Sequence, residues 1–507
     1  MAAGLLNNSY NVPSNAVFIS AGTNIQSVVN QHGAGTTYVL GAGTHYGQTF
    51  SVRSGDTFIG QEGAVLDGNG ADHAINGWNN QNVTIANIRF TDYAPSPNGS
   101  GILGNDSSTT GWKVLGNEFD HISNGAALRL GNGMLVQDNT FHDNLSNGIS
   151  SWSTANSTIQ NNEFWNNNAS GNSPFSNTGD AAAIKITQTT GTQILDNYVH
   201  DTANGIGIWT DINCDNTLIQ GNLVQHNGAM GIAVELDYGS VLRGNTVVDN
   251  NTSNFSGWGG AGIYIFNAQD AEVTGNTVAG NGGGVFVYEE GRGSGTQGTW
   301  VTRNVNVHDN TIIADEGPTG IGGGATNDGS IQFQGNDYNL SGSASFYYGG
   351  SISASQWQAL GYDTSGSSYN ASAGTPVAPA SPPTGSSTPP APAGDGSANT
   401  LVLEISQDAW RGDAQYTVSV DGVQQGGVRT ASALHGSGDV DVVEISGDWS
   451  NGEHSVSVAF VNDLWGNTLS EDRNLWVEAI SYDGTRIGGD AVLYTQSAQS
   501  FGFTDVL

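Results

Sequence analysis

The sequence predicts an all-β protein in which a right-handed parallel β-helix is followed by a small β-sandwich. The main observation is a short unit of the type Gly-Asn-Thr-Val or Asp-Asn-Thr-Phe that recurs from about residue 80 to 340. Its shortest spacings, from Asn117 to Asn139 and from Asn139 to Asn162, are 22 and 23 residues. Between the copies, short Val, Ile and Leu alternations are separated by Gly and Asn, without a helix-length amphipathic stretch. A period of this length is typical of a solenoid.

The recurring asparagine predicts a tight bend between the strands of each coil. Asn tolerates a left-handed backbone conformation, and its amide can hydrogen-bond turn groups. Because successive coils stack, these amides can also bond to one another as a ladder. We expect the residues before 80 to form the first coils and their cap, and residues 341–370 to close the other end.

The composition divides the chain into three parts. Residues 1–370 carry the repeats and are expected to form the β-helix. Residues 371–400 are Pro, Ala, Ser, Thr and Gly with almost no large apolar side chain, which predicts a semi-extended linker. Residues 401–507 contain alternating strands such as 416–420 and 454–460, which favour a small β-sandwich.

The charge balance limits the possible partners. The chain has 507 residues, 12 Lys and Arg, 46 Asp and Glu, and a net charge of -34. Such a chain is not expected to bind nucleic acid or an anionic membrane, and it suits a neutral sugar better. Cys214 is the one cysteine, so no intrachain disulfide is possible, and no stretch is apolar and long enough to span a membrane. The first residues are not a conventional signal peptide, yet we expect a secreted monomer.

One outward face of the coil is expected to carry aromatic and charged side chains. Alternate residues of a strand point out when the Val, Ile and Leu positions point in. The outward row comprises Arg129, Trp152, Lys185, Trp209, Asp211, Glu235, Tyr264, Phe266, Phe286 and Tyr288. Aromatic faces stack on sugar rings and charged groups bind hydroxyls, so the row predicts a saccharide-binding surface. The alternative is that the aromatic rings stack on one another and stiffen the sheet.

Two acids of this row occupy nearly the same place in consecutive repeats. Asp211 ends the segment 205–211, Glu235 ends the segment 231–235, and each segment leads into a similar ending. Neighbouring rungs are about 4.8 Å apart, and retaining glycosidases place their carboxyl groups about 5–5.5 Å apart. Like charges this close raise one pKa, which provides a proton donor beside an ionised nucleophile. The alternative is that both acids merely cap turns.

The sequence around these acids resembles a known family. Trp209-Thr-Asp211, followed one coil later by Val234-Glu235, is similar to the motif pair of glycoside hydrolase family 120, which comprises β-xylosidases built on a parallel β-helix. The resemblance implies that Asp211 is the nucleophile and Glu235 the acid/base of a retaining glycoside hydrolase acting on a plant or microbial polysaccharide, with a xylan-type polymer as the expected substrate. More broadly, the repeats resemble right-handed β-helix carbohydrate-active proteins.

Two other functions remain open. Many β-helix polysaccharide lyases and epimerases use Lys or Arg to remove the proton beside a uronic carboxylate, and Lys185 and Arg129 provide such groups. For a hydrolase, Lys185 and Asp180 would instead hold substrate hydroxyls. The third possibility is a glycan-binding protein without catalysis.

The C-terminal part carries a second resemblance. Segments 461–466 (Val-Asn-Asp-Leu-Trp-Gly) and 472–477 (Asp-Arg-Asn-Leu-Trp-Val) closely resemble the signature of family 60 carbohydrate-binding modules, which bind xylan through calcium. Oxygen ligands suit calcium. The resemblance implies that Asp463 and Asp472 are calcium ligands and that Trp465 flanks the sugar.

Overall fold

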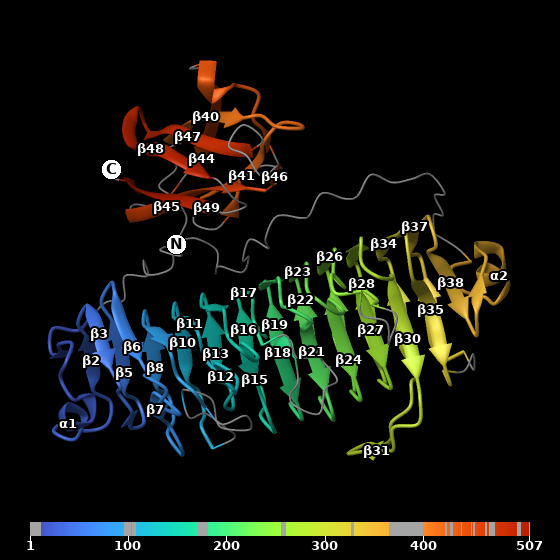
Figure 1. Cartoon of the computed structure of the whole chain (residues 1–507), viewed down its shortest axis with the longest axis horizontal. Coiled ribbons are helices and arrows are strands. Elements are labelled where there is room, and N and C mark those ends of the chain that lie inside the picture. Colours follow the sequence, from blue (N-terminus) through green and yellow to red (C-terminus); the bar gives the residue numbers. More distant parts are fainter. Residues whose placement is uncertain are drawn as a thin grey trace. The chain divides into compact units, whose positions relative to one another are not determined.

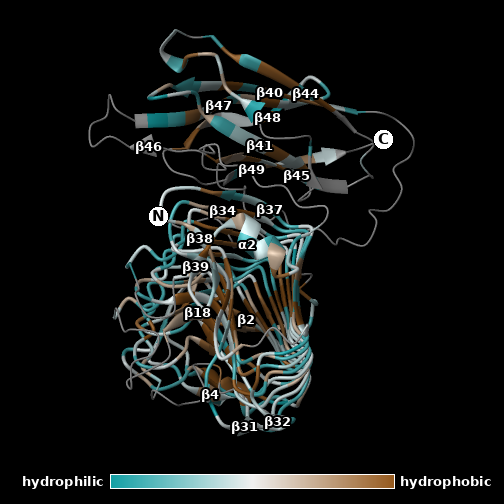
Figure 2. Ribbon diagram, turned by 90° about the vertical axis from the view of Figure 1, so that its right-hand side faces the viewer, coloured by the Kyte–Doolittle hydropathy of each residue, from teal (hydrophilic) through white to brown (hydrophobic). Residues whose placement is uncertain are grey.

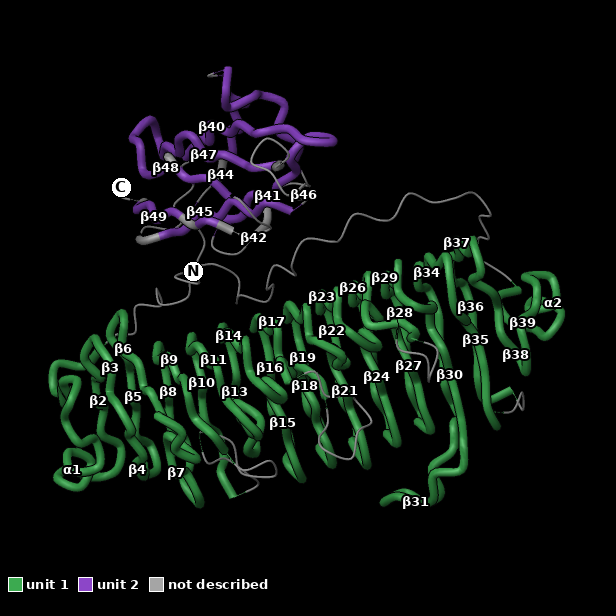
Figure 3. The backbone as a smooth tube through the Cα atoms, viewed as in Figure 1, with its two compact units in different colours: residues 1–377 green, residues 378–507 purple. Residues whose placement is uncertain are grey.

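The computed structural model describes the chain from residue 12 to 505 with some gaps. The residues outside the description within this range are 96–102, 104–107, 171–180, 255–259, 326–328, 365–398, 421–422, 426–428, 438, 448, 450–451, 462–463, 466–471 and 494–497. The described residues form two compact units, Met1–Val377 and Ala378–Leu507, which Figure 3 distinguishes by colour. Of the predicted linker, residues 371–398 lie outside the description, whereas Asn399 and Thr400 already belong to the first strand of the second unit.

The first unit is a right-handed parallel β-helix, as the sequence predicts. Its coils contribute strands to three long sheets (Figure 1). The first sheet has 13 strands, from β1 (Val17–Ile19) to β36 (Ile331–Gln334), and the second has 12, from β3 (Gly43–Tyr46) to β37 (Asp337–Leu340). Most of these strands have three or four residues, and many are followed directly by a left-handed Gly, Asn, Asp or His that makes the bend.

The third sheet positions the candidate site. Its ten strands are, in spatial order, β12 (Leu128–Arg129), β15 (Ile149–Ser150), β18 (Ala182–Thr187), β21 (Ile206–Asp211), β24 (Ile232–Glu235), β27 (Ile263–Phe266), β30 (Val285–Glu289), β35 (Pro318–Gly323), β38 (Ser345–Tyr348) and β39 (Ser351–Ile352). All neighbouring pairs are parallel except β38 and β39, which close the sheet as an antiparallel pair.

Apolar residues of the three sheets meet in one continuous core. Figure 2 shows the apolar strand segments along the coil and more polar colours at the turns. Phenylalanines at equivalent positions stack on successive rungs, for example Phe119 on Phe141 and Phe141 on Phe164, with ring centroids 4.7 and 4.8 Å apart. Two short helices were not expected from the sequence: α1 (Ile25–Val29) near the start, and α2 (Ala354–Ala359), whose Trp357 is buried and stacks on Phe346 at the other end.

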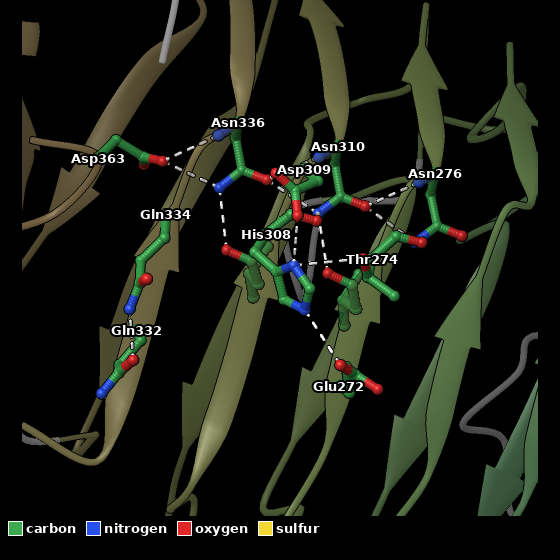
Figure 4. A network of polar contacts seen from close by, with 12 residues as sticks. Glu272, Thr274, Asn276, His308, Asp309, Asn310, Gln332, Gln334, Asn336 and Asp363 are labelled. Atoms are coloured by element: carbon green, nitrogen blue, oxygen red, sulfur yellow. Dashed lines mark hydrogen bonds and ion pairs between the residues drawn. The ribbon is translucent and has the colours of Figure 1, made fainter. Parts of the chain in front are cut away.

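The predicted asparagine ladder is confirmed. In each rung the Nδ2 group donates to the Oδ1 atom of the next rung's asparagine at 2.9–3.0 Å, and the ladder ends on a carboxylate (Figure 4). Its members are Asn117, Asn139, Asn162, Asn197, Asn222, Asn245, Asn276, Asn310, Asn336 and Asp363.

The expected left-handed backbone lies one residue earlier than predicted. Asp138 has φ 57° before Asn139, and Asn161 has φ 54° before Asn162. The preceding residue makes the bend, so the ladder asparagine can aim its amide into the coil. Asn139 Nδ2, for example, also donates to the carbonyl oxygen of Val114 at 2.9 Å.

The second unit consists of two antiparallel five-stranded sheets around a separate apolar core, as expected for a β-sandwich. One sheet contains β44 (Asp441–Gly447), β40 (Asn399–Asp408), β47 (Asp472–Tyr482), β46 (Leu464–Trp465) and β48 (Thr485–Leu493). The other contains β42 (Val423–Gln424), β41 (Gln415–Val420), β45 (Gly452–Phe460), β49 (Ala498–Asp505) and β43 (Arg429–Thr430).

Candidate active site

The register of the third sheet brings the two acids side by side. Thr210 of β21 pairs with Val234 of β24, and Asp211 and Glu235 are the next residue of each strand. Thr210 and Val234 are buried, and Val234 belongs to the coil core. Because successive side chains of a strand alternate, the two acids lie on the opposite, outward face. They occupy adjacent rungs, about 4.8 Å apart.

The outward residues form two columns rather than the single row that the sequence indicated. The column beside the acids contains Arg129, Ser150, Lys185, Trp209, Ala233, Tyr264 and Phe286. The column of the acids contains Thr187, Asp211, Glu235, Phe266 and Tyr288. Trp152 follows Ser150 by two residues, so it lies on the Thr187 side.

A second apolar cluster surrounds the acids on this outward face. Trp209, Ala233, Tyr264 and Phe266 all belong to it and are nearly inaccessible to solvent. The two acids share that environment, with 6% of Asp211 and 4% of Glu235 exposed. Neither acid is folded into the coil core, yet both are shielded from water, which strengthens every charge interaction between them and their neighbours.

Each acid is held by a different cation. Lys185 Nζ lies 2.9 Å from Asp211 Oδ2 and 3.1 Å from the centre of the Trp209 ring. Arg292 Nη1 lies 2.7 Å from Glu235 Oε1, and its guanidinium carbon is 5.0 Å from the centre of the Phe266 ring. The order of charges across the site is therefore cation, acid, acid, cation.

Arg292 is the functional candidate that sequence reasoning missed. It belongs to residues 290–301, here called the arm, which follow β30 and contain the hairpin of β31 (Ser294–Gly295) and β32 (Gly298–Thr299). Figure 1 shows the arm extending beyond the ends of β27 and β30. The arm lies outside the repeat, so periodicity says nothing about it. The available signal was a Gly-rich insertion, Gly291-Arg-Gly293-Ser-Gly295, carrying one of only 12 cations.

The surroundings of Glu235 raise its proton affinity. Burial, and next the charge of Asp211, raise the pKa of Glu235 to about 7, although Arg292 and Lys185 oppose the shift. Glu235 is therefore partly protonated near neutral pH. Asp211, in contrast, is ion-paired to Lys185 at 2.9 Å, and an opposite charge at that distance favours the ionised carboxylate.

A third carboxyl group, Asp237, lies fully buried beside the pair. Thr210 Oγ1 donates to its Oδ2 atom at 2.6 Å and Ser240 Oγ at 3.0 Å, while the Tyr238 backbone N–H donates to Oδ1 at 2.6 Å. Burial raises the pKa of Asp237 to about 7. Because Thr210 precedes one acid and Asp237 follows the other by two residues, this contact ties the two acid-bearing strand ends together.

The backbone turns away immediately after each acid. Ile212 has φ 46° and Leu236 has φ 52°, and the equivalent residues of the adjoining rungs, Gln188 and Asn267, are left-handed as well. For a β-branched residue such as Ile212, this conformation costs on the order of 1–3 kcal/mol. The bend ends the strand at the acid, which therefore lies at the rim of the sheet.

The other predicted site residues fall into three groups. Tyr264, Phe266 and Tyr288 pack on one another, with ring centroids 5.6 to 6.3 Å apart, which is the stacking alternative that the sequence left open. Trp152 is 50% exposed, and Arg129 lies two rungs from Lys185. Asp180 lies outside the described residues.

Little of the predicted calcium site is described. Asp463 lies outside the described residues, as do the side chains of Trp465 and Asp472, but the backbone of Trp465 pairs directly with that of Asp472 between β46 and β47. Within the described part of the chain, no group of three or more His, Cys, Asp and Glu side chains is arranged to hold a metal ion. Among the same residues, no helix has the length and apolar character needed to cross a membrane.

Comparisons with protein families agree with this architecture. Residues 73–254 match the model of the right-handed beta helix region, and residues 400–495 match that of the Ca-dependent, xylan-binding carbohydrate-binding module. The chain is a right-handed parallel β-helix protein with a carbohydrate-binding module similar to family 60. Residues 172–371 also match the model of the periplasmic copper-binding protein NosD. No curated protein sequence matches the chain.

Several solved structures are similar to the chain over part of its length. The A-module of a mannuronan C-5 epimerase, AlgE6 of Azotobacter vinelandii, is 16% identical with a TM-score of 0.44, covering 68% of this chain and 93% of its own. The catalytic unit of an α-1,3-glucanase from Streptomyces thermodiastaticus is 14% identical with a TM-score of 0.49, covering 72% of each chain. The Streptococcus pneumoniae surface adhesin PfbA is 12% identical with a TM-score of 0.34, covering 66% of this chain and 90% of its own. Such similarity concerns the fold alone.

Proposed function

We propose that this β-helix is a retaining glycoside hydrolase acting on a neutral polysaccharide of the xylan type, with Asp211 as nucleophile and Glu235 as acid/base. One observation carries the proposal: two outward acids occupy the same position of adjacent rungs, and each is held by its own cation. A spacing of about one rung suits two carboxyl groups that act from opposite sides of one anomeric carbon.

In the first step, the Asp211 carboxylate attacks the anomeric carbon. Glu235 gives its proton to the glycosidic oxygen, the bond between carbon and oxygen breaks, and the leaving sugar departs as an alcohol. Lys185 keeps the attacking carboxylate ionised and fixed. Arg292 stabilises the Glu235 carboxylate that proton donation leaves behind.

In the second step, Glu235 acts as a base. It takes a proton from water, and the water oxygen attacks the same carbon and displaces Asp211. Glu235 regains its proton and Asp211 its charge, so the site returns to its starting state. Two displacements at one carbon retain the configuration of the product. A Glu235 pKa near 7 suits a group that must both donate and accept a proton.

The charge of the site favours a neutral sugar. Two cations balance two acids, and the chain as a whole carries a net charge of -34, so an anionic polymer gains little attraction here. The exposed ring of Trp152 lies on the same outward face as Asp211 and two rungs away from it, a distance of roughly 10 Å. This position suits a polysaccharide chain that approaches the acids across the rungs before β18. We propose this ring as a stacking platform for the polysaccharide.

The C-terminal unit is proposed to hold xylan-type chains near the β-helix through calcium bound by Asp463 and Asp472, with Trp465 beside the sugar. The match to the Ca-dependent module family over residues 400–495 supports this assignment. A module that recognises plant polysaccharide implies an extracellular enzyme, and we propose that it acts as a monomer.

A second candidate function is a uronate lyase or C5-epimerase. It is favoured by the placement of Arg129 and Lys185 in one outward column with a single rung between them, because such chemistry needs cations that neutralise a carboxylate and a base near its α-carbon. The ion pair of Lys185 with Asp211 opposes this role, because it keeps the ammonium group occupied.

The deciding experiment is product analysis with a panel of xylans, arabinoxylan, neutral glucans and alginate. We expect new reducing ends without ultraviolet absorbance from neutral substrates, and loss of these products with Asp211→Ala and Glu235→Gln. Unsaturated or epimerised uronates in the products would favour the second candidate. Binding without turnover on every glycan would leave only the carbohydrate-binding role.

A further inference from the structure

The arm is anchored at its base to the turn that follows β27. Asn267 Nδ2 donates to the carbonyl oxygens of Glu290 and Trp300, at 2.8 and 3.0 Å, and the Glu290 backbone N–H donates to Asn267 Oδ1 at 3.1 Å. One side chain therefore holds both ends of the arm.

The tip of the arm contacts the turns that follow the two acids in the sequence. The backbone N–H and Oγ1 of Thr296 donate to Asn213 Oδ1 at 2.8 and 3.3 Å, and Asn213 lies two residues after Asp211. Gly295 comes so close to Asn213 and Tyr238 that a Cβ atom would collide with both. Arg292 lies between base and tip, where it meets Glu235 at 2.7 Å.

We propose that Arg292 is a positioning residue for Glu235, and that its place there depends on the contact between the arm and Asn213. The argument is geometric. Arg292 comes from an excursion 57 residues further along the chain, and 32% of its side chain is exposed, so enclosure in the coil core is not what constrains its position. The two anchors of the arm supply that constraint. Its catalytic consequence rests on the proposed hydrolase function.

The surroundings of Glu235 make Arg292 the group to test. The charged and titratable neighbours are Asp211 on β21, Lys185 on β18, Tyr264 on β27, Asp237 in the following turn, and Glu290 and Arg292 on the arm. Asp211 and Lys185 form their own ion pair at 2.9 Å. Arg292 is thus the cation whose displacement changes the field at Glu235 most directly.

The test measures the titration of Glu235 itself in the full-length protein without substrate. Glutamate labelled with 13C at the side-chain carboxyl reports each pKa by NMR, and the signal missing from Glu235→Gln assigns the resonance. We expect Arg292→Gln to raise the pKa of Glu235 by on the order of one unit, because an opposite charge is lost. Arg292→Lys is expected to restore part of the difference.

Asn213→Gly is the decisive variant. It removes the amide that holds the tip and changes no charge, and glycine accepts the left-handed backbone of this position, φ 61°, without strain. We expect the pKa of Glu235 to rise here too, by less than in Arg292→Gln. The matched control is Asn216→Gly, which replaces another left-handed asparagine of the same coil whose amide bonds to the adjacent Asp215; it is expected to titrate as wild type.

An unchanged Glu235 titration in Asn213→Gly overturns the role of the arm, and an unchanged titration in Arg292→Gln overturns the role of Arg292. Gly295→Ala, whose added methyl group would collide with Asn213 and Tyr238 and displace the tip, provides a second variant if Asn213→Gly unfolds. The titration requires no turnover. A protein that hydrolyses nothing can therefore still support this inference, and an active hydrolase with unshifted titrations contradicts it alone.

Discussion

The outward faces of the second and third sheets use charged residues in opposite ways. On the second sheet, His142 bridges Asp143 of its own turn at 2.8 Å and Glu118 of the preceding rung at 3.3 Å. His200 repeats the arrangement on the same sheet, and His308 repeats it on the first sheet, where Figure 4 shows it between Asp309 and Glu272. In each of these three places, a histidine lies between two carboxylates.

On the third sheet, by contrast, two carboxylates lie on adjacent rungs and the cations stand outside the pair. A pattern repeated along the coil stabilises the coil, because every rung benefits from it. The pair of Asp211 and Glu235 occurs on one pair of rungs only among the described strands of the third sheet. It is buried, and burial raises the pKa of Glu235, so the pair does not stabilise the coil in the way that a repeated contact does. The comparison therefore supports the proposed functional role of the charges on the third sheet.

The largest expected effect breaks this comparison at the acids. Glu235→Gln removes the proton donor and is expected to lower kcat by about 10²–10⁴-fold, and Asp211→Ala at least as much. Glu163→Gln, the same substitution on the second sheet, loses only a contact to His200 and keeps near wild-type rates. Initial rates on an active xylan substrate check the prediction. Equal losses in Glu163→Gln and Glu235→Gln would remove the distinction between the faces.

The next largest effect concerns the asparagine ladder, which stabilises the coil that carries both outward faces. Asn222→Ala leaves buried partners on Asn197, Asn245 and Ile194 without their hydrogen bonds. Each buried polar group left without a partner costs about 1–3 kcal/mol. Because three groups lose a partner, we expect the free energy of unfolding to fall by at least about that much. Thermal unfolding measures the change. Glu163→Gln, which loses a partly exposed contact to His200, should shift the melting temperature far less, and the reverse order would mean that the ladder contributes little to the stability of the coil.

The pH dependence of turnover should follow Glu235. Its pKa near 7 predicts that kcat/KM falls as pH rises above about 7, because the proton needed by the leaving group is lost. Arg292→Gln is expected to move this limb to higher pH. A pH–rate profile checks both statements, and a profile unchanged in Arg292→Gln would show that another group governs the limb.

The pH dependence of stability should follow the histidines of the second sheet instead. Burial opposes the charged form of His142 and His200, but hydrogen bonds to their carboxylates outweigh it and raise both pKa values. A raised folded pKa contributes stability that is complete below the unfolded value of about 6.5 and is lost as pH rises through the folded value. Replacing both histidines with Gln should flatten the dependence of the melting temperature on pH above about 6.5, whereas Glu235→Gln should leave this slope intact.

The smallest expected effect is at Trp152. Removing its exposed ring in Trp152→Ala is expected to raise KM for long substrates by about 2- to 10-fold while kcat changes little, because stacking contributes about 0.5–1.5 kcal/mol. Trp78→Ala removes a ring that is 57% exposed elsewhere on the coil and serves as the control. A KM that rises equally in both variants would argue against a platform beside the acids.

Periodicity explains what the sequence predicted correctly. The spacing of Asn117, Asn139 and Asn162 indicates the coil and its ladder, and similar repeat endings place Asp211 beside Glu235. A repeat reveals only what recurs, however. The bend was assigned to the wrong residue because Asp138 and Asn139 are both good turn formers, and only their neighbours decide which one bends.

The residues that sequence reasoning could not place come from outside the repeat. Arg292 reaches Glu235 through an insertion whose path depends on Asn267 and Asn213, two turn residues with no sequence mark of that role. The burial of Tyr264 and Phe266 also depends on how rings of different rungs pack together. The alternation of inward and outward residues predicts the face on which a side chain lies. It does not predict which neighbouring side chains bury it.

The most direct test of the central claim is to trap the intermediate on Asp211. A 2-deoxy-2-fluoro glycoside of a sugar that the enzyme cleaves slows the second displacement, and mass spectrometry of peptides locates the attached sugar. We predict one covalent sugar on the peptide containing Asp211, absent in Asp211→Ala and accumulating in Glu235→Gln with an activated leaving group. A label on another residue, or hydrolysis with inverted configuration and no label, would contradict the account.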